Sequence, residues 1–241
     1  MKFTPVLRAE ALKVLTLRSL CGILLAVFAV TTAFSALAGS TNGSEPDFDP
    51  LFTSLSGVMP GQIAAIAFGA MAVSSEYHGA GIRLSLAAVP QRGRWFAAKL
   101  TVIAAPVLAV GLVTALAALL AARARLGSSA DDLTGGEQVR GVLGCGTYFM
   151  LMALFAAGLT ALFRSGMATL STLIPFILIV SFVIGDAAGG ATDFLPDKAG
   201  QVVLYQMHEG TLGPWAGLAV TALWAAAALL AGAWRLRSRD A

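Results

Sequence analysis

The chain has 241 residues, of which 57% are hydrophobic and only 12% are charged. A soluble domain is about 25% charged, and a soluble fold of this size cannot bury so much apolar surface, so the composition excludes an ordinary soluble domain. The net charge of +3 is small, and we expect no nucleic-acid partner. Cys21 and Cys145 lie in apolar stretches, which predicts two small buried residues without a disulfide framework or metal-ligand spacing.

The N-terminal part contains a basic leader followed by an apolar run. Residues 4–19 are predicted to form a helix at the membrane surface, and the alternative is a basic anchor without a defined helix. The apolar face of this helix holds Leu7, Ala11, Val14 and Leu15. The run at 20–38 is long enough to span a membrane, although Ser35–Ala38 also resembles the cleavage site of a signal peptide.

Six apolar intervals bounded by charged residues are long enough to cross a bilayer, whose core of about 30 Å requires roughly 20 helical residues. They are continuously apolar, whereas strands of a membrane barrel alternate between apolar and polar residues. The sequence therefore predicts an all-α membrane protein with one transmembrane domain over residues 1–241. The six predicted spans lie approximately at 20–38, 53–74, 99–122, 141–163, 166–185 and 212–234.

The distribution of basic residues predicts the orientation. Six spans place both termini on one side, and the segments of that side hold Lys2, Arg8, Lys13, Arg18, Arg83, Arg92, Arg94, Lys99, Arg164, Arg235, Arg237 and Arg239. The other side holds only Arg123, Arg125, Arg140 and Lys198. Because basic residues are retained in the cytoplasm, we expect both termini there. Three tryptophans near span ends fit an interfacial aromatic belt: Trp95, Trp215 and Trp234.

Two connections between predicted spans are patterned rather than simply polar. The inner one, residues 74–94, mixes apolar residues with arginine before Pro90, which predicts a short helix across the inner mouth of the protein. The alternative is an ordinary basic loop. The outer one, residues 186–213, contains enough apolar residues to dip toward the bilayer or cap a cavity, and the alternative is a solvated loop.

Glycine pairs with G-x-x-x-G spacing occur at Gly57 and Gly61 and at Gly213 and Gly217. Such pairs allow close helix packing, although they are a weak signal in a glycine-rich chain.

The sequence lacks the common motifs of catalysis. It contains no phosphate-binding loop, no H-E-x-x-H and no G-x-S-x-G, and no Asp, Glu, Lys or Arg lies between the end residues of a predicted span. We therefore expect no enzymatic activity, no catalytic residue, no metal and no cofactor in this chain. If it moves a substrate, the energy should come from a partner.

The inner connection resembles that of ABC-2-type transporter permeases, the membrane subunits of bacterial ABC exporters. The residues that carry this resemblance are Glu76-Tyr77, Gly79, Ile82-Arg83, Leu86-Ala87, Pro90, Arg92, Arg94 and Lys99. The N-terminal segments at 7–10, 13 and 17–19 and the outer segment at 195–200 are similar to those of the same family. The chain departs from the family at Gly81, where a hydroxylated residue is usual, and at Ala11, where an aromatic residue is usual.

The resemblance implies an exporter subunit in the bacterial inner membrane that pairs with a second permease. Each permease would dock a separate ATPase subunit, which would carry ATP and magnesium, and a hydrophobic or amphipathic substrate would cross the membrane. The implied residues of the coupling helix, which seats on the ATPase, are Glu76, Tyr77, Gly79, Ile82, Arg83, Leu86, Pro90, Arg92 and Arg94. The N-terminal interfacial helix would contribute Arg8, Glu10, Lys13 and Arg18, and the outer gate would contain Phe194, Leu195, Pro196 and Gly200. The alternative function is a non-transporting polytopic membrane protein, such as an immunity or sensor-associated subunit.

Overall fold

The computed structural model describes residues 3–41, 49–77, 81–126, 133–179, 189–206 and 210–238. These residues form helices and no strand. Five of their helices are long and apolar enough to cross a membrane, and they contain five of the six predicted spans wholly or in large part. The five helical stretches are Arg18–Ser40, Val58–Tyr77, Arg92–Arg125, Gly135–Phe163 and Pro214–Ser238. The chain is therefore an all-α protein with the features of a multi-pass membrane protein.

The predicted N-terminal helix is present and ends before the first long helix. Helix α1 spans Phe3–Thr16, and α2 spans Arg18–Thr41 after a break at Leu17. The buried side of α1 holds Val6, Glu10 and Val14, which face the rest of the molecule.

The second predicted span is divided into two helices, α3 at Pro50–Leu55 and α4 at Val58–Ser74. Asp49 caps α3 by accepting a hydrogen bond from the backbone N–H of Phe52, at 2.9 Å. At the break, Gly57 lies against α2, where an added Cβ would be only 2.0 Å from the carbonyl oxygen of Thr31. Close contact with a neighbouring helix thus requires glycine at this point, which the apolar pattern alone does not reveal.

The inner connection contains a short helix, as predicted. After the 3₁₀ turn η1 at Ser75–Tyr77, helix α5 spans Gly81–Ala88, and Pro90 separates it from α6 at Arg92–Leu126. Helix α7 spans Gly135–Phe163 and begins with a capping box between Thr134 and Glu137. Helices α6 and α7 extend beyond their predicted spans. The hydropathy pattern left out the extra residues because they include charged side chains.

The fifth predicted span is only partly described. Helix α8 spans Gly166–Pro175, and its apolar helical stretch continues to Ile179, while 180–185 lies outside the described residues. This stretch is shorter than a full membrane span. The last part of the chain comprises three short helical segments and one long helix: η4 at Gly189–Phe194, α9 at Pro196–Gln201, η5 at Val202–Leu204 and α10 at Pro214–Ser238.

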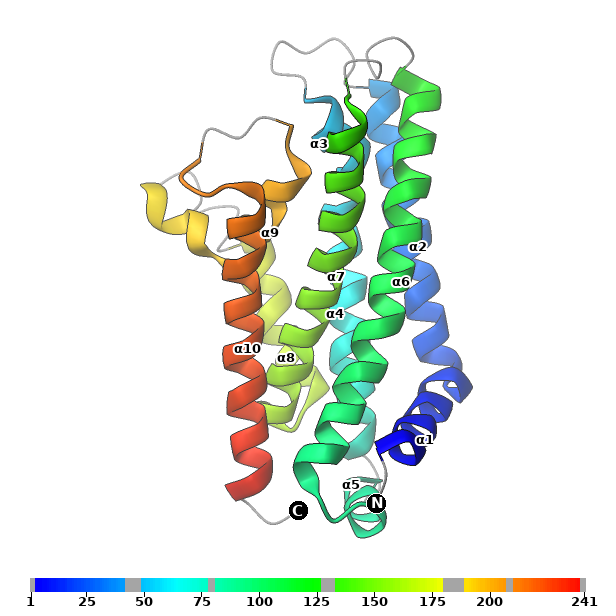
Figure 1. Ribbon diagram of the computed structural model, residues 1–241, viewed down its shortest axis with the longest axis vertical. Helices are drawn as coiled ribbons and strands as arrows, with labels where there is room; N and C mark the ends of the chain where they lie inside the picture. Colours follow the sequence, from blue (N-terminus) through cyan, green and yellow to red (C-terminus); the bar gives the residue numbers. More distant parts are fainter. Residues whose placement is uncertain are drawn as a thin grey trace.

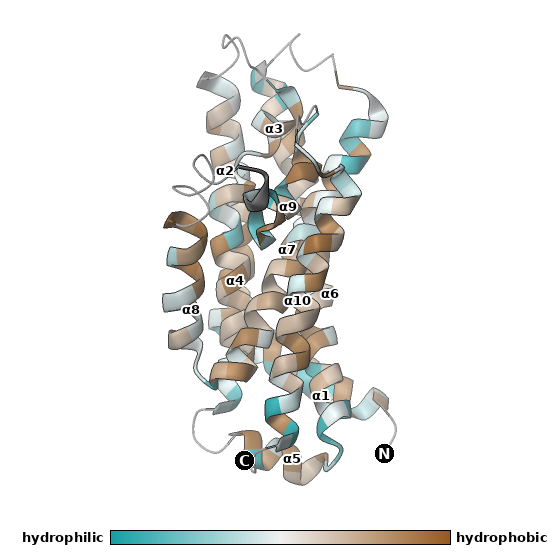
Figure 2. Cartoon of the chain, turned by 90° about the vertical axis from the view of Figure 1, so that its left-hand side faces the viewer, coloured by the Kyte–Doolittle hydropathy of each residue, from teal (hydrophilic) through white to brown (hydrophobic). Residues whose placement is uncertain are grey.

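The long helices run lengthwise beside one another, and α7 packs against α4, α6 and α10 (Figure 1). Both ends of the chain lie at the same end of this bundle, together with α1 and α5 (Figure 1). We call this the termini end, and we call the opposite end, where α3 lies, the far end. Hydrophobic residues predominate along the middle of the bundle (Figure 2).

Cys145 is buried as predicted, but Cys21 is exposed on α2, so its predicted burial is wrong.

Candidate functional site

Four charged side chains meet at the termini end and form what we call the charge cluster: Glu10 and Lys13 of α1, Glu76 of η1 and Lys99 of α6. The Lys99 Nζ lies 2.5 Å from Glu10 Oε2 and 2.6 Å from Glu76 Oε1. The Lys13 Nζ lies 2.8 Å from Glu10 Oε1 and 3.0 Å from Glu76 Oε1. Each lysine thus bridges the same two carboxylates, and the cluster has no net formal charge.

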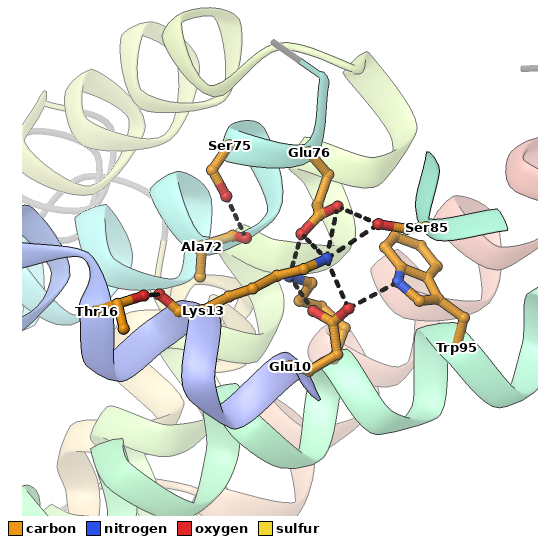
Figure 3. Close-up of polar contacts among 9 residues, drawn as sticks. Glu10, Lys13, Thr16, Ala72, Ser75, Glu76, Ser85 and Trp95 are labelled. Carbon is orange, nitrogen blue, oxygen red and sulfur yellow. Dashed lines mark hydrogen bonds and ion pairs between the residues drawn. The ribbon is translucent and has the colours of Figure 1, made fainter. Parts of the chain in front are cut away.

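Two further side chains complete the charge cluster (Figure 3). Ser85 of α5 donates a hydrogen bond to Glu76 Oε2 at 2.9 Å, and its hydroxyl accepts one from Lys13 at 3.0 Å. Trp95 of α6 donates its indole N–H to Glu10 Oε1 at 3.1 Å, and its ring centroid lies 5.9 Å from the Lys99 Nζ. Helices α1, α5 and α6 and the turn η1 are therefore joined by one set of polar contacts.

Most of the charge cluster is shielded from solvent. Glu10 is 3% exposed, Glu76 is 4% exposed and Lys99 is 1% exposed, whereas the side chain of Lys13 is 40% exposed. Burying an ion costs several kcal/mol, and only close pairing with additional hydrogen bonds offsets that cost. The geometry supplies both, so removal of any one buried partner would leave an uncompensated charge. This makes the cluster a strong constraint on the relative positions of the helices that it joins.

The protonation of Lys13 follows from its surroundings. Burial lowers the pKa of its ammonium group, but hydrogen bonds and charge attraction from Glu10 and Glu76 raise that pKa by more. The net pKa of Lys13 lies above its ordinary value of 10.5, so the side chain is fully charged at neutral pH.

Local helix geometry places these groups in register. Glu10 and Lys13 are three residues apart on α1, and Trp95 and Lys99 are four residues apart on α6, so each pair shares a helical face. Ser85 lies on α5, which directly follows the turn that carries Glu76. The cluster contains no histidine or cysteine that could serve as a nucleophile or soft metal ligand, and its evident capacity is to hold elements together.

The residues predicted for the coupling helix separate into an inward-facing set and a surface set. Glu76 and Ile82 are buried, Leu86 packs against the core, and the half-buried Tyr77 hydroxyl donates to the Ala161 carbonyl at 3.5 Å. The Glu76 carboxylate faces inward to Lys13 and Lys99, and its predicted part in coupling to a partner stays a prediction. The surface set contains Arg83 and Pro90, which are exposed, and Arg92 and Arg94, which are half-buried. Gly79 lies outside the described residues.

The predicted residues of the N-terminal helix divide in the same way. Glu10 and Lys13 belong to the charge cluster, while Arg8 and Arg18 are exposed.

Trp95 was predicted to lie in an interfacial aromatic belt, but it is only 2% exposed and serves the charge cluster instead. The sequence prediction also gave no role to Ser85 and treated Lys99 only as one of a group of basic residues. The sequence signal that could have pointed to the charge cluster is the charged residues that recur beside the ends of the predicted spans.

The termini end has a basic surface. Both of its described acidic residues, Glu10 and Glu76, are inside the charge cluster. The charged side chains described at this end outside the cluster are all arginines: Arg8, Arg18, Arg83, Arg92, Arg94, Arg164, Arg235 and Arg237. This end therefore presents positive charge to its surroundings, as the cytoplasmic side of a membrane protein does.

The predicted outer-gate residues lie against the long helices toward the far end. Pro196 and Gly200 are buried, Leu195 is half-buried and Phe194 is exposed. The carbonyl oxygen of Pro196 accepts a hydrogen bond from Thr221 of α10 at 2.8 Å, and that of Phe194 accepts one from Trp224 at 2.9 Å. The outer connection is thus packed onto α10 in this part, not fully solvated.

A second buried polar group, the amide–phenol network, lies beneath α9. It comprises Gln62 of α4, Tyr148 of α7 and Gln201 of α9. The Tyr148 hydroxyl donates to Gln62 Oε1, and Gln201 Nε2 donates to the Tyr148 hydroxyl at 3.2 Å. Sequence reasoning missed this network, although Gln62 and Tyr148 are polar residues inside predicted spans, where such residues often have a function.

No protein-family model matches the chain, and no curated protein matches its sequence. Membership of the ABC-2 permease family therefore stays a prediction that rests on the residues of the inner connection and on the arrangement of spans.

Proposed function

We propose that this chain is the membrane-spanning permease subunit of an ATP-driven exporter of the ABC-2 type. A separate ATPase subunit would bind ATP and magnesium and would dock on the termini end. The observation that carries this proposal is the charge cluster, because it fixes α1 and α5 to α6 directly beneath a basic surface. A surface helix held this firmly is suited to receive a displacement from a partner and pass it to a membrane-spanning helix.

In this proposal, a displacement caused by the ATPase passes to the long helices through the contacts of Glu76. A displacement of α5 would act on Ser85, then on the Glu76 carboxylate, and then on Lys99 of α6. Lys13 would carry the same displacement to α1. Because breaking a buried ion pair costs about 3–5 kcal/mol, η1, α1 and α6 should move together, and α5 would follow through the hydrogen bonds of Ser85. Glu76 is therefore a positioning residue in this proposal, and Arg83 is a contact residue.

The orientation and assembly follow from the same proposal. Both termini would be cytoplasmic in the inner membrane of a bacterium, and α8 with the residues after it would provide the sixth crossing. A second copy of the chain or a homologous permease would complete the translocation path. Phe194, Leu195, Pro196 and Gly200 would belong to the outer gate, where Gly200 packs so closely on Tyr148 that a Cβ would lie 2.4 Å from its ring.

A pocket between α4, α8 and α9 supports a hydrophobic or amphipathic substrate. Its volume is about 270 Å³, and its walls are mainly apolar, with Met59, Ile63 and Ile177 among them. Gln62 and Gln201 of the amide–phenol network add polar groups to the same pocket, and Asp197 and Lys198 of α9 add charged ones. Apolar walls with a few placed polar groups are typical of small-molecule sites.

Affinity purification from native membranes in mild detergent tests the proposal. The tagged chain should recover an ATPase with a phosphate-binding loop, under conditions in which a known transporter complex stays intact. Arg83→Glu should reduce that recovery at least tenfold, because it reverses charge on the proposed contact surface. The matched control is Arg125→Glu, which reverses an exposed charge in the last turn of α6 and should leave the recovery unchanged.

Two results would contradict the proposal. One is recovery of the wild-type chain without an ATPase while the known complex survives, and the other is an equal effect of the two charge reversals. Recovery of a peptide toxin or a sensor kinase in place of an ATPase would instead support the non-transporting alternative.

A further inference from the structure

An apolar groove lies between α1, α2 and α6 near the termini end. Its volume is about 300 Å³, and α1 contributes Leu7 and Leu15, α2 contributes Cys21 and Leu24, and α6 contributes Ala105 and Pro106. Thr101 also lines the groove, but its hydroxyl donates to the Ala97 carbonyl of its own helix at 2.9 Å. The groove therefore offers a ligand almost no polar group.

The position of the groove along the helices corresponds to the boundary between lipid headgroups and acyl chains. On α6, the groove residues begin immediately after Lys99, the last charged residue before the long apolar part of this helix. On α2, they begin just after Arg18. Leu12 of α1 is 62% exposed and Leu15 is 71% exposed, as suits a helix that lies on a bilayer.

Positive charge flanks the groove. Arg18 and Cys21 are three residues apart on α2, and Arg8 and Leu15 are two helical turns apart on α1, so each arginine shares a face with a groove residue. Both arginines are exposed. The nearby Glu10 is buried and paired with lysines, so it does not offset this charge at the surface. A ligand that combines an alkyl chain with an anionic head matches this arrangement.

We propose that the groove binds one acyl chain of an anionic phospholipid, whose phosphate group pairs with Arg8 and Arg18. An α-helix with its side chains is 10–12 Å across, so a groove of about 300 Å³ fits an alkyl chain better than a partner helix. The bound lipid fills the space between α1 and the two long helices and holds α1 at the membrane surface. This site is separate from the charge cluster and does not depend on the proposed transport function.

Cys21 provides a direct reporter of groove occupancy. The full-length chain is placed in phosphatidylcholine vesicles with increasing phosphatidylglycerol, and alkylation of Cys21 by N-ethylmaleimide is followed by mass spectrometry. Phosphatidylglycerol should slow the alkylation severalfold, because the anionic lipid occupies the groove for longer. Cys145 is fully buried and should stay unmodified, which shows in every sample that the protein is folded.

Variants separate binding at the arginines from a general effect of the bilayer. Arg18→Gln should reduce the protection by phosphatidylglycerol about fivefold, because one basic residue near an anionic surface contributes about that factor. Arg237→Gln removes an exposed arginine on α10 at the same end and should preserve the protection. A reporter outside the groove, Leu25→Cys in a Cys21→Ser background, should react at a rate that is independent of the phosphatidylglycerol content.

Four outcomes would overturn the proposal. In the first, Arg18→Gln and Arg237→Gln have equal effects on the protection. In the second, the Leu25→Cys reporter is protected as strongly as Cys21. In the third, protection of Cys21 depends on the ratio of protein to lipid and not on lipid charge, which would identify a second copy of the chain as the occupant. Ala105→Phe, which fills the groove, should protect Cys21 equally in both lipids; continued dependence on phosphatidylglycerol would also contradict the proposal.

Discussion

The two ends of the bundle bury polar groups in different ways. At the termini end, ion pairs between two glutamates and two lysines join α1, η1 and α6, and Ser85 of α5 adds hydrogen bonds to the charge cluster. Toward the far end, α9 contributes Gln201 to the amide–phenol network, whose three side chains are neutral, although the neighbouring Asp197 of α9 is also buried. Breaking a buried ion pair costs about 3–5 kcal/mol, whereas losing a neutral hydrogen bond costs about 0.5–1.5 kcal/mol.

This difference has a mechanical consequence. Elements joined by buried ion pairs keep one arrangement, because any separation exposes an unpaired charge. Neutral amide and hydroxyl groups can exchange partners at lower cost, because each of them can both donate and accept. The ion pairs thus hold α1, η1 and α6 together more strongly than the neutral hydrogen bonds of the amide–phenol network hold α9.

The largest effect is expected from Lys99→Met, which leaves Glu10 and Glu76 buried with only the partly exposed Lys13 between them. We expect a loss of about 3–5 kcal/mol in the free energy of unfolding, measured by denaturant titration in detergent micelles. Lys198→Met, on α9, is the matched control and should change that free energy by less than about 1 kcal/mol. Adding Glu76→Gln to Lys99→Met should restore part of the loss. A loss as small as that of the control would remove the distinction between the two ends.

The packing of α9 on α10 is expected to give the next largest effect. A Cβ on Gly217 would lie 2.1 Å from the carbonyl oxygen of Ala199, whereas a Cβ on Gly213 would meet nothing within 4 Å. Gly217→Ala should therefore reduce the free energy of unfolding by about 1–3 kcal/mol, since the backbones must move apart. Gly213→Ala should be nearly neutral in the same titration. Equal effects of the two substitutions would show that α9 does not pack closely on α10.

A smaller effect is expected from Tyr148→Phe, which removes the hydroxyl shared by Gln62 and Gln201. The two amides can still approach each other at 3.5 Å, so we expect a loss of about 1 kcal/mol in the free energy of unfolding. Tyr77→Phe removes a hydroxyl that makes one long hydrogen bond and should cost less. A loss from Tyr148→Phe as large as that from Lys99→Met would contradict the neutral, adaptable character of this region.

The smallest effect concerns the pH dependence that Lys13 gives to the termini end. The pKa of Lys13 is higher in the folded protein than its ordinary value, so its ion pairs contribute fully below that ordinary value and are lost as the pH rises through the folded pKa. Because Lys13 is partly exposed, we expect a contribution of less than about 1 kcal/mol. The difference in unfolding free energy between wild type and Lys13→Met should be constant from pH 7 to 9 and shrink above about pH 11. A difference that grows with alkalinity would contradict this assignment.

Much of the architecture follows from local features of the sequence. A bilayer requires about twenty consecutive apolar residues in a helix, and this requirement can be read from one segment at a time. The short helix before Pro90 and the excess of basic residues at one end are equally local. Those features predicted the all-α bundle, the interfacial helix α1 and the helix α5 in the inner connection.

The positions of the polar groups could be decided only by the tertiary structure. Glu10 and Glu76 are distant in sequence, and only the packing of α1 and α4 against α6 brings both carboxylates to Lys99. Gly213 and Gly217 form one G-x-x-x-G pair in the sequence, yet only Gly217 meets a neighbouring backbone. Hydropathy depends on a residue's own chemistry, whereas ion pairing and close packing depend on which face of each helix meets its neighbour. The sequence therefore determined that helices cross the membrane, and the packing decided which of their side chains work together.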